Sequence, residues 1–166
     1  MGKNVNIVNN ENIKGNVKVT LMHGNKEYKK FVGHNKATLA LCEYLRDALV
    51  ADYIIARRPG LIKPCRKDAS NNLIPIGTGT PFTSDKKNAY TEEDTGVSAT
   101  LTFLIPNTNM TAGTQIDGFK LYSKDTSEKE YASISLDSME GYDPENPLVV
   151  SGDVNLKVEW TITVNY

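Results

Sequence analysis

The residue types that most often perform catalysis are scarce in this chain and lie far apart. Its only histidines are His23 and His34, and neither has a Cys, Asp or Glu at a spacing typical of a metal site or a hydrolytic triad. A triad assembled from residues distant in sequence stays open. The only cysteines, Cys42 and Cys65, lack partners at the spacing of zinc ligands. We therefore expect no metal, no cofactor and no catalytic residues, and two free thiols rather than the alternative, a disulfide.

Three further segments would support chemistry only in a particular geometry. Paired carboxylates occur at 92–94 and at 143–146, and such pairs serve glycosidases and calcium sites. The order of acidic residues in an EF-hand is absent, so solvated loops are the preferred interpretation. Gly77–Thr80 is similar to a phosphate-binding loop, but the Lys-Ser/Thr that should follow is missing. A flexible turn is expected there.

The densest basic run lies between two predicted elements. In a protein of nearly neutral charge, such a run is either a solvated face or a contact with an acidic surface of a neighbouring subunit, where arginine binds carboxylates through two hydrogen bonds. These residues are the candidate interface: Arg57, Arg58, Lys63, Arg66 and Lys67.

The bulk composition limits the possible functions. The 166 residues are 39% hydrophobic and 23% charged, as in an ordinary folded domain. A formal net charge of -1 disfavours nucleic-acid binding, which needs concentrated Lys and Arg. Neither a membrane span nor a secretory signal is recognisable, so we expect a protein made in a cytoplasm, with no membrane partner.

The elements that must position these residues are mostly strands. Between Val154 and Tyr166, apolar and polar residues alternate without a break, which predicts a strand with one buried face and places Trp160 in the core. A hairpin is predicted in the first half, with Gly24 and Asn25 at its turn. Segments 97–105, 116–122, 131–136 and 148–150 are also expected to be strands.

One helix interrupts this β pattern. A stripe of apolar residues at helical spacing predicts it near residues 36–53, with Asn35 as its N-cap. Residues 68–93 are expected to form loops and short edge strands that favour a partner contact. The predicted fold is mainly β: an Ig-like or jelly-roll-like sandwich over residues 13–166, in which the helix covers one opening or edge. Residues 1–12 are predicted to be a flexible N-terminal arm.

Several phrases of the sequence resemble small structural proteins of tailed bacteriophages, including the crAss-like group. The resemblance covers most of the chain and rests on strand and turn segments, not on an active-site signature. The segments that carry it are Lys18–Lys26, Gly33–Asn35, Leu45–Leu49, Arg57–Pro59, Ser98–Pro106, Ile116–Tyr122, Asn146–Leu148 and Leu156–Ile162.

The resemblance implies a virion component assembled in the cytoplasm of the host bacterium. We expect a non-enzymatic auxiliary or decorating capsid subunit that binds the capsid surface in many copies, with the major capsid protein or other virion proteins as partners. The arm, the 68–93 segment and the basic run are the expected contacts. A head-fibre or tail component remains an alternative within the same class. A carbohydrate-binding or adhesion module, and an enzyme such as a wall hydrolase, are alternatives from other classes.

Overall fold

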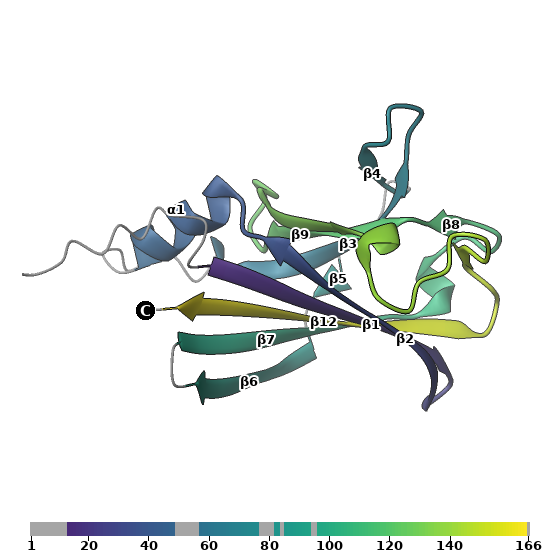
Figure 1. Cartoon of the computed structure of the whole chain (residues 1–166), viewed down its shortest axis with the longest axis horizontal. Helices are drawn as coiled ribbons and strands as arrows, with labels where there is room; N and C mark the ends of the chain where they lie inside the picture. The colour runs from purple at the N-terminus through teal and green to yellow at the C-terminus, as the bar shows by residue number, and fades with distance from the viewer. Residues whose placement is uncertain (1–12, 49–56, 77–81, 84, 94–95, 166) are drawn as a thin grey trace, which may run out of the picture.

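A computed structural model describes residues 13–48, 57–76, 82–83, 85–93 and 96–165 of the chain. Twelve strands and one α-helix make up most of this part, with the strands arranged in two layers (Figure 1). The elements are β1 (Ile13–His23), β2 (Lys26–Lys36), α1 (Leu39–Ala48), β3 (Pro59–Lys67), β4 (Leu73–Pro75), β5 (Phe82–Thr83), β6 (Asp85–Glu93), β7 (Gly96–Ile105), β8 (Gln115–Ile116), β9 (Gly118–Ser123), β10 (Glu130–Ser135), β11 (Leu148–Val149) and β12 (Val154–Asn165).

The first sheet has five antiparallel strands in the order β2-β1-β12-β7-β6. The alternating strand predicted at the end of the chain is β12, in the middle of this sheet, and Trp160 is fully buried. The β1–β2 hairpin is confirmed, with Gly24 at φ +56° at the first position of its turn, where glycine tolerates a left-handed backbone. One face of the sheet is apolar and the other polar, which explains why the sequence predicts it well.

The second sheet is shorter and less regular. Its antiparallel strands follow the order β10-β9-β3-β4, and β5 pairs with β3. Asp117 interrupts the strand predicted over 116–122, so that β8 and β9 are separate elements. Five of the six residues of β9 are buried, because side chains on both of its faces are covered. Alternation is therefore weak in this sheet.

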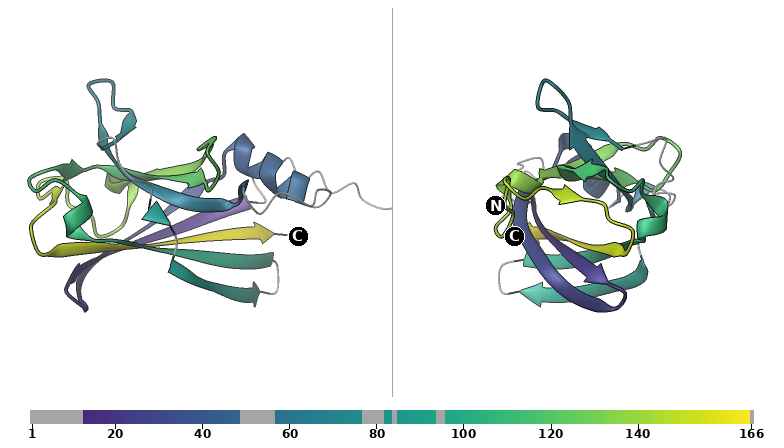
Figure 2. Two further views of the ribbon diagram at one scale, coloured as in Figure 1. Left: turned by 180° about the vertical axis from the view of Figure 1, so that it is seen from behind. Right: turned by 90° about the vertical axis from the view of Figure 1, so that its right-hand side faces the viewer.

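The two sheets pack face to face, and the predicted mainly β sandwich is confirmed (Figure 2). Their facing side chains form one main core. Its fully buried members include Val17, Val19, Ile62, Phe103, Ile105, Ile116, Phe119, Leu121, Leu136, Val158 and Trp160.

The helix begins later than the sequence predicts. Asn35 and Lys36 belong to β2, so the expected cap at Asn35 and the expected start at 36 are wrong. Thr38 caps the helix instead, because its hydroxyl oxygen accepts a hydrogen bond from the Leu41 amide at 3.3 Å. The hydroxyl also donates to the Tyr131 carbonyl at 2.7 Å, which joins the cap to β10. Residues 49–53 of the predicted helix lie outside the described residues.

Helix α1 closes one end of the sandwich, as predicted (Figure 1). A second apolar cluster forms there between the helix and the strand ends. Ile162 and Val164 of β12 pack against it, so it continues the apolar face of the first sheet. Its buried members are Ile13, Ala37, Leu41, Cys42 and Tyr131.

The 68–93 segment is more regular than predicted. It contains β6, a nine-residue strand at the edge of the first sheet, where only loops and short edge strands were expected. It also contains β4, which forms a hairpin with β3 that projects from the body of the sandwich (Figures 1 and 2). The predicted arm, residues 1–12, lies outside the described residues.

Candidate interaction site

The predicted basic run lies on β3 and just before it, and three of its five members meet carboxylates of their own chain. Arg57 Nε lies 3.9 Å from Asp125 Oδ2, and Lys67 pairs with Asp137. Lys63 Nζ lies 2.5 Å from Glu128 Oε2 and 4.9 Å from the centroid of the Tyr122 ring. No ion pair with a described residue engages Arg58 or Arg66, and both are exposed. Within the candidate interface, Arg57, Lys63 and Lys67 are thus paired inside the chain, and whether the run forms an interface stays a prediction.

Arg66 occupies a position where the apolar core reaches the rim of the sandwich. It continues the inward-facing row of β3 that contains Ile62 and Pro64, since alternate residues of a strand share a face. Ile62 and Pro64 are buried, whereas Arg66 is exposed. Ile74 lies directly opposite Arg66 on β4 and is 47% exposed. A cation and an apolar side chain therefore stand together where the core ends.

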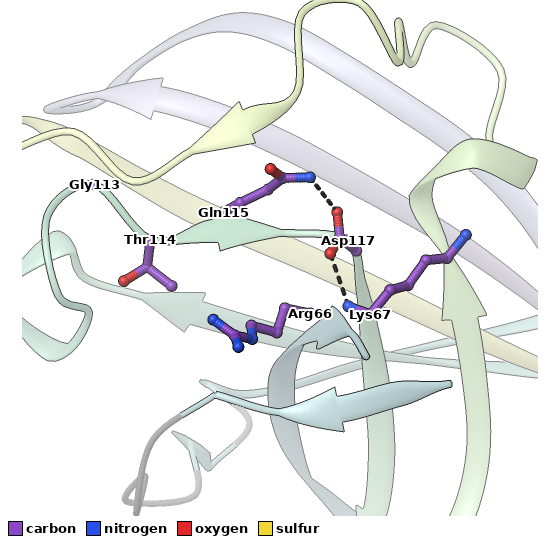
Figure 3. Close-up of a pocket in the computed structure, with 6 residues that line it drawn as sticks. All are labelled: Arg66, Lys67, Gly113, Thr114, Gln115 and Asp117. Atoms are coloured by element: carbon purple, nitrogen blue, oxygen red, sulfur yellow. Dashed lines mark hydrogen bonds between the residues drawn. The ribbon is translucent and has the colours of Figure 1, made fainter. Parts of the chain in front are cut away.

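Beside Arg66 lies an open depression of about 620 Å³, between the β3–β4 hairpin and the loop that leads into β8 (Figure 3). Gly113 enters this loop with φ +81°, a backbone conformation that favours glycine. The depression is lined by Arg66, Lys67, Gly113, Thr114, Gln115 and Asp117.

Asp117 holds the floor of the depression together. Its carboxylate accepts hydrogen bonds from the Lys67 amide at 2.7 Å and from Gln115 Nε2 at 2.6 Å, one at each oxygen (Figure 3). Its backbone amide donates to the Cys65 carbonyl, and its carbonyl accepts from the Leu136 amide, both at 2.8 Å. Asp117 thus links β3 to the turn after β10. The role of this carboxylate is structural.

The projecting hairpin is braced by a side chain at its own tip. Asp68 Oδ1 accepts hydrogen bonds from the backbone amides of Ser70 and Asn72, each at 2.8 Å. The bond from Asn72, followed by that from Ser70, lowers the pKa of Asp68 below its ordinary value although the carboxylate is exposed. Asn71 takes the left-handed φ of +66° that the turn requires. The hairpin that carries Ile74 is therefore held in one conformation.

The outer face of the first sheet is largely polar and carries ion pairs and hydrogen bonds between neighbouring strands. Lys18 Nζ lies 3.0 Å from Glu159 Oε2, and Lys157 Nζ lies 3.4 Å from the other oxygen of the same carboxylate. Burial alone would raise the pKa of Glu159, but the hydrogen bond from Lys18 and the charge of Lys157 lower it overall. Thr100 and Thr161 form a cross-strand hydrogen bond at 2.7 Å. The buried Thr20 hydroxyl on the same face has no hydrogen-bond partner among the described residues, and Leu104 is 50% exposed there.

No model of a known protein family, no curated protein and no solved structure matches this chain. Among the described residues, no helix is long and apolar enough to cross a membrane.

Neither histidine lines this depression. His23 Nδ1 lies 3.4 Å from Asp153 Oδ2, and the ring stacks on Tyr28 with centroids 4.4 Å apart. His34 hydrogen-bonds Asn16 on the outer face of the first sheet. In the part of the chain that the structure describes, no three His, Cys, Asp or Glu side chains are grouped as metal ligands would be.

Cys42 and Cys65 are both buried thiols. Burial raises the pKa of the Cys65 thiol to about 12 and also raises that of Cys42. Both thiols are therefore protonated at neutral pH, and thiolate chemistry is suppressed.

The two predicted acidic clusters and the glycine-rich segment are the remaining sequence predictions. The Asp143 carboxylate accepts a hydrogen bond from the Glu145 amide at 3.0 Å, which is typical of a turn, as expected for residues 143–146. In the 92–94 cluster, Glu92 and Glu93 belong to β6, and Asp94 lies outside the described residues. Gly77–Thr80 lies outside them as well.

Thr114, Gln115 and Asp117, which share the rim with Arg66, were not predicted from the sequence, whereas Ile74 lies within the 68–93 segment that was expected to contact a partner. No signal marked Asp117, because Lys120 is likewise a charged residue between apolar neighbours in the same predicted strand. The others are ordinary loop or edge residues in the sequence. They come together only because two segments about fifty positions apart are paired through Asp117.

Proposed function

We propose that this protein is a non-enzymatic structural subunit of a tailed-phage particle, an auxiliary capsid subunit that binds the capsid surface. The observation that supports this proposal is the braced β3–β4 hairpin, which presents exposed Ile74 beside Arg66 on a rigid sandwich. Interfaces combine apolar side chains with arginine in this way, and a prearranged surface loses little conformational entropy on binding. The partners are the major capsid protein or other virion proteins.

Such a small contact would be sufficient to hold the subunit on a particle if the contact is repeated in many copies. A particle repeats the same subunit by symmetry, so modest contacts add up over many copies. The sequence resemblance to phage structural proteins agrees with this role. A head-fibre or tail position uses the same kind of contact in fewer copies.

The experiment is to purify phage particles from the source of the sequence on a density gradient and to identify their proteins by mass spectrometry. We expect peptides of this chain in the particle band, at a fixed ratio to the major capsid protein. A ratio far below that of a shell component would assign the protein to a head fibre or the tail. If the chain is found only in the unbound fraction, the proposal is rejected.

A second candidate, glycan binding, is favoured by one observation near the turn of the β1–β2 hairpin. The Tyr28 ring is 47% exposed and stacks on His23, with Asp153 beside it. An aromatic face next to hydrogen-bonding groups suits a sugar ring. Trp160 does not contribute, because it is fully buried in the core. Glycan-array binding that is lost in Tyr28→Ala would support this candidate, and an array without signal would remove it.

A further inference from the structure

We infer that the depression beside Arg66 binds a carboxylate side chain, Asp or Glu, from a neighbouring protein of the particle. The inference rests on the proposed function and adds to it the chemistry of the partner. It goes beyond a general basic surface, because it assigns the contact to Arg66 and to the groups around it.

The first step is that the charge of Arg66 is available. The other cations of β3 meet carboxylates of this chain, Lys63 at Glu128 and Lys67 at Asp137. Arg66 is exposed and has no ion pair with any described residue. A guanidinium presents its donors in a planar fork that fits the two oxygens of a carboxylate, so its natural partner is a carboxylate from another chain.

The second step is that the carboxylate within the depression does not take that role. Both oxygens of Asp117 accept hydrogen bonds, one from the Lys67 amide and one from the Gln115 side chain. Asp117 still repels an incoming anion to some extent, and Lys67, which also lines the depression, is already paired with Asp137. Arg66 is therefore the cation of the lining that no described carboxylate pairs, and its guanidinium, not the net charge of the lining, selects an anion.

The third step is that the surroundings fit the end of a carboxylate side chain. Figure 3 shows the Arg66 side chain extending toward Thr114 on the same side of the depression. The Thr114 hydroxyl is a further donor for a carboxylate oxygen. Exposed Ile74, across from Arg66, gives the neighbouring part of the partner an apolar contact. An acidic residue flanked by apolar residues therefore matches this surface.

The fourth step is that the site is already formed without a ligand. Arg66 lies on β3, which pairs with β9 on one side and β4 on the other. Asp68 accepts two backbone hydrogen bonds at the tip of the hairpin, and Asp117 joins the junction between β8 and β9 to β3. Little ordering is needed when the partner binds, which preserves the affinity of a small contact.

The test is an NMR titration of the ¹⁵N-labelled full chain with the peptide acetyl-Leu-Glu-Leu-amide, and with acetyl-Leu-Gln-Leu-amide as its uncharged match. We expect saturable shifts of the Arg66 Nε–H and of the Thr114 and Gln115 amides with the Glu peptide only. Arg66→Ala should weaken binding about tenfold or more, since hydrogen bonds to charged groups are the stronger ones. Arg58→Ala, the other exposed arginine without an ion pair to a described residue, should leave the affinity unchanged.

Three results would overturn the inference: no saturable shifts, equal shifts with both peptides, or unchanged binding by Arg66→Ala. Loss of binding in Arg58→Ala alone would also overturn it, because the carboxylate would then bind elsewhere. Failure here is distinct from failure of the proposed function. A chain that is part of the particle but ignores the Glu peptide retains the function and loses this site. If the chain binds the peptide at Arg66 but is absent from particles, the carboxylate site is supported and the proposed function is rejected.

Discussion

The two ends of the sandwich are closed in different ways. At the helix end, α1 covers the opening with apolar side chains, and its Leu41 is buried in one cluster with Tyr131 of β10. At the hairpin end, hydrogen bonds to Asp117 join the strands and leave a polar depression open. One end therefore buries apolar side chains, whereas the other leaves polar side chains exposed.

The helix end is also tied to the second sheet by polar contacts. The Thr38 hydroxyl donates to the Tyr131 carbonyl, and the Tyr131 hydroxyl donates to the Arg57 carbonyl at 2.5 Å. These bonds satisfy buried polar groups that would otherwise oppose burial. The apolar cluster at this end is nevertheless small compared with the main core. Removing an apolar side chain from this cluster should therefore lower the free energy of unfolding by less than the same removal from the main core.

The largest expected effect compares the same substitution in the two clusters. Leu136 is fully buried in the main core near the hairpin end, and Leu41 is 2% exposed at the helix end. We expect Leu136→Ala to lower the free energy of unfolding by about 4 kcal/mol and Leu41→Ala by about 2 kcal/mol, because a tightly enclosed site relaxes less around the cavity. Urea denaturation at 25 °C measures both. An equal or larger loss in Leu41→Ala would contradict the view that the helix end is the weaker cluster.

A smaller effect tests the cap that holds the helix in place. Thr38→Ala removes the N-cap of α1 and its bond to the Tyr131 carbonyl, so we expect a loss of about 1–2 kcal/mol in the free energy of unfolding. Thr38→Ser keeps the hydroxyl and should retain most of the stability. The cap assignment is wrong if Thr38→Ala leaves the free energy of unfolding unchanged and Asn35→Ala lowers it instead.

The contrast between the ends also explains what the sequence could predict. The strands of the first sheet alternate because one face is buried and the other is solvated, so β12 and the buried Trp160 are predictable from spacing alone. In the second sheet, β9 is covered on both faces and its alternation is lost. The mainly β class and the capping helix were predictable, but the strand order was not.

The start of the helix was misplaced for a local reason. Both Asn35 and Thr38 are good cap residues, and the sequence alone does not show that β2 continues to Lys36. The choice is made by tertiary structure, because the pairing of β2 with β1 extends to Lys14. At the other end, the basic run was visible in the sequence. Which of its charges are paired depends on Asp125, Glu128 and Asp137, which lie far away in the chain.

The two thiols give a direct comparison of local opening. Cys42 lies in the small cluster under α1, and Cys65 lies on β3 at the centre of the second sheet. In native protein at pH 8, we expect a thiol reagent to modify Cys42 faster than Cys65, because α1 opens at lower free energy than the sheet. Cys65→Ala and Cys42→Ala each leave one thiol, and mass spectrometry measures the rates. Faster modification of Cys65 would place the less stable region in the second sheet.

Burial of the Cys65 thiol also makes the stability of the folded protein depend on pH. Burial raises the pKa of Cys65 from its ordinary value of 9.0 to about 12, so the folded state holds this proton more tightly than the unfolded state. The associated stability is present below pH 9 and is lost as the pH rises toward 12. Burial also raises the pKa values of Tyr122 and Tyr131 to about 12, which adds to the same alkaline loss. Urea midpoints that stay constant from pH 8 to 11 would contradict this expectation.

The smallest expected effect concerns the tip of the hairpin. Asp68→Ala removes the acceptor for the Ser70 and Asn72 amides, so both should exchange with solvent faster while the melting temperature stays unchanged. Ser70→Ala leaves the acceptor in place and serves as the control. Because these amides lower the pKa of Asp68 below its ordinary value of 3.8, the brace is complete above that pH and is lost as the pH falls through the lower, folded-state value. Hydrogen exchange followed by NMR resolves this local change from global unfolding. A large drop in melting temperature would show that the hairpin is part of the stabilising body, and the distinction between the two ends would then fail.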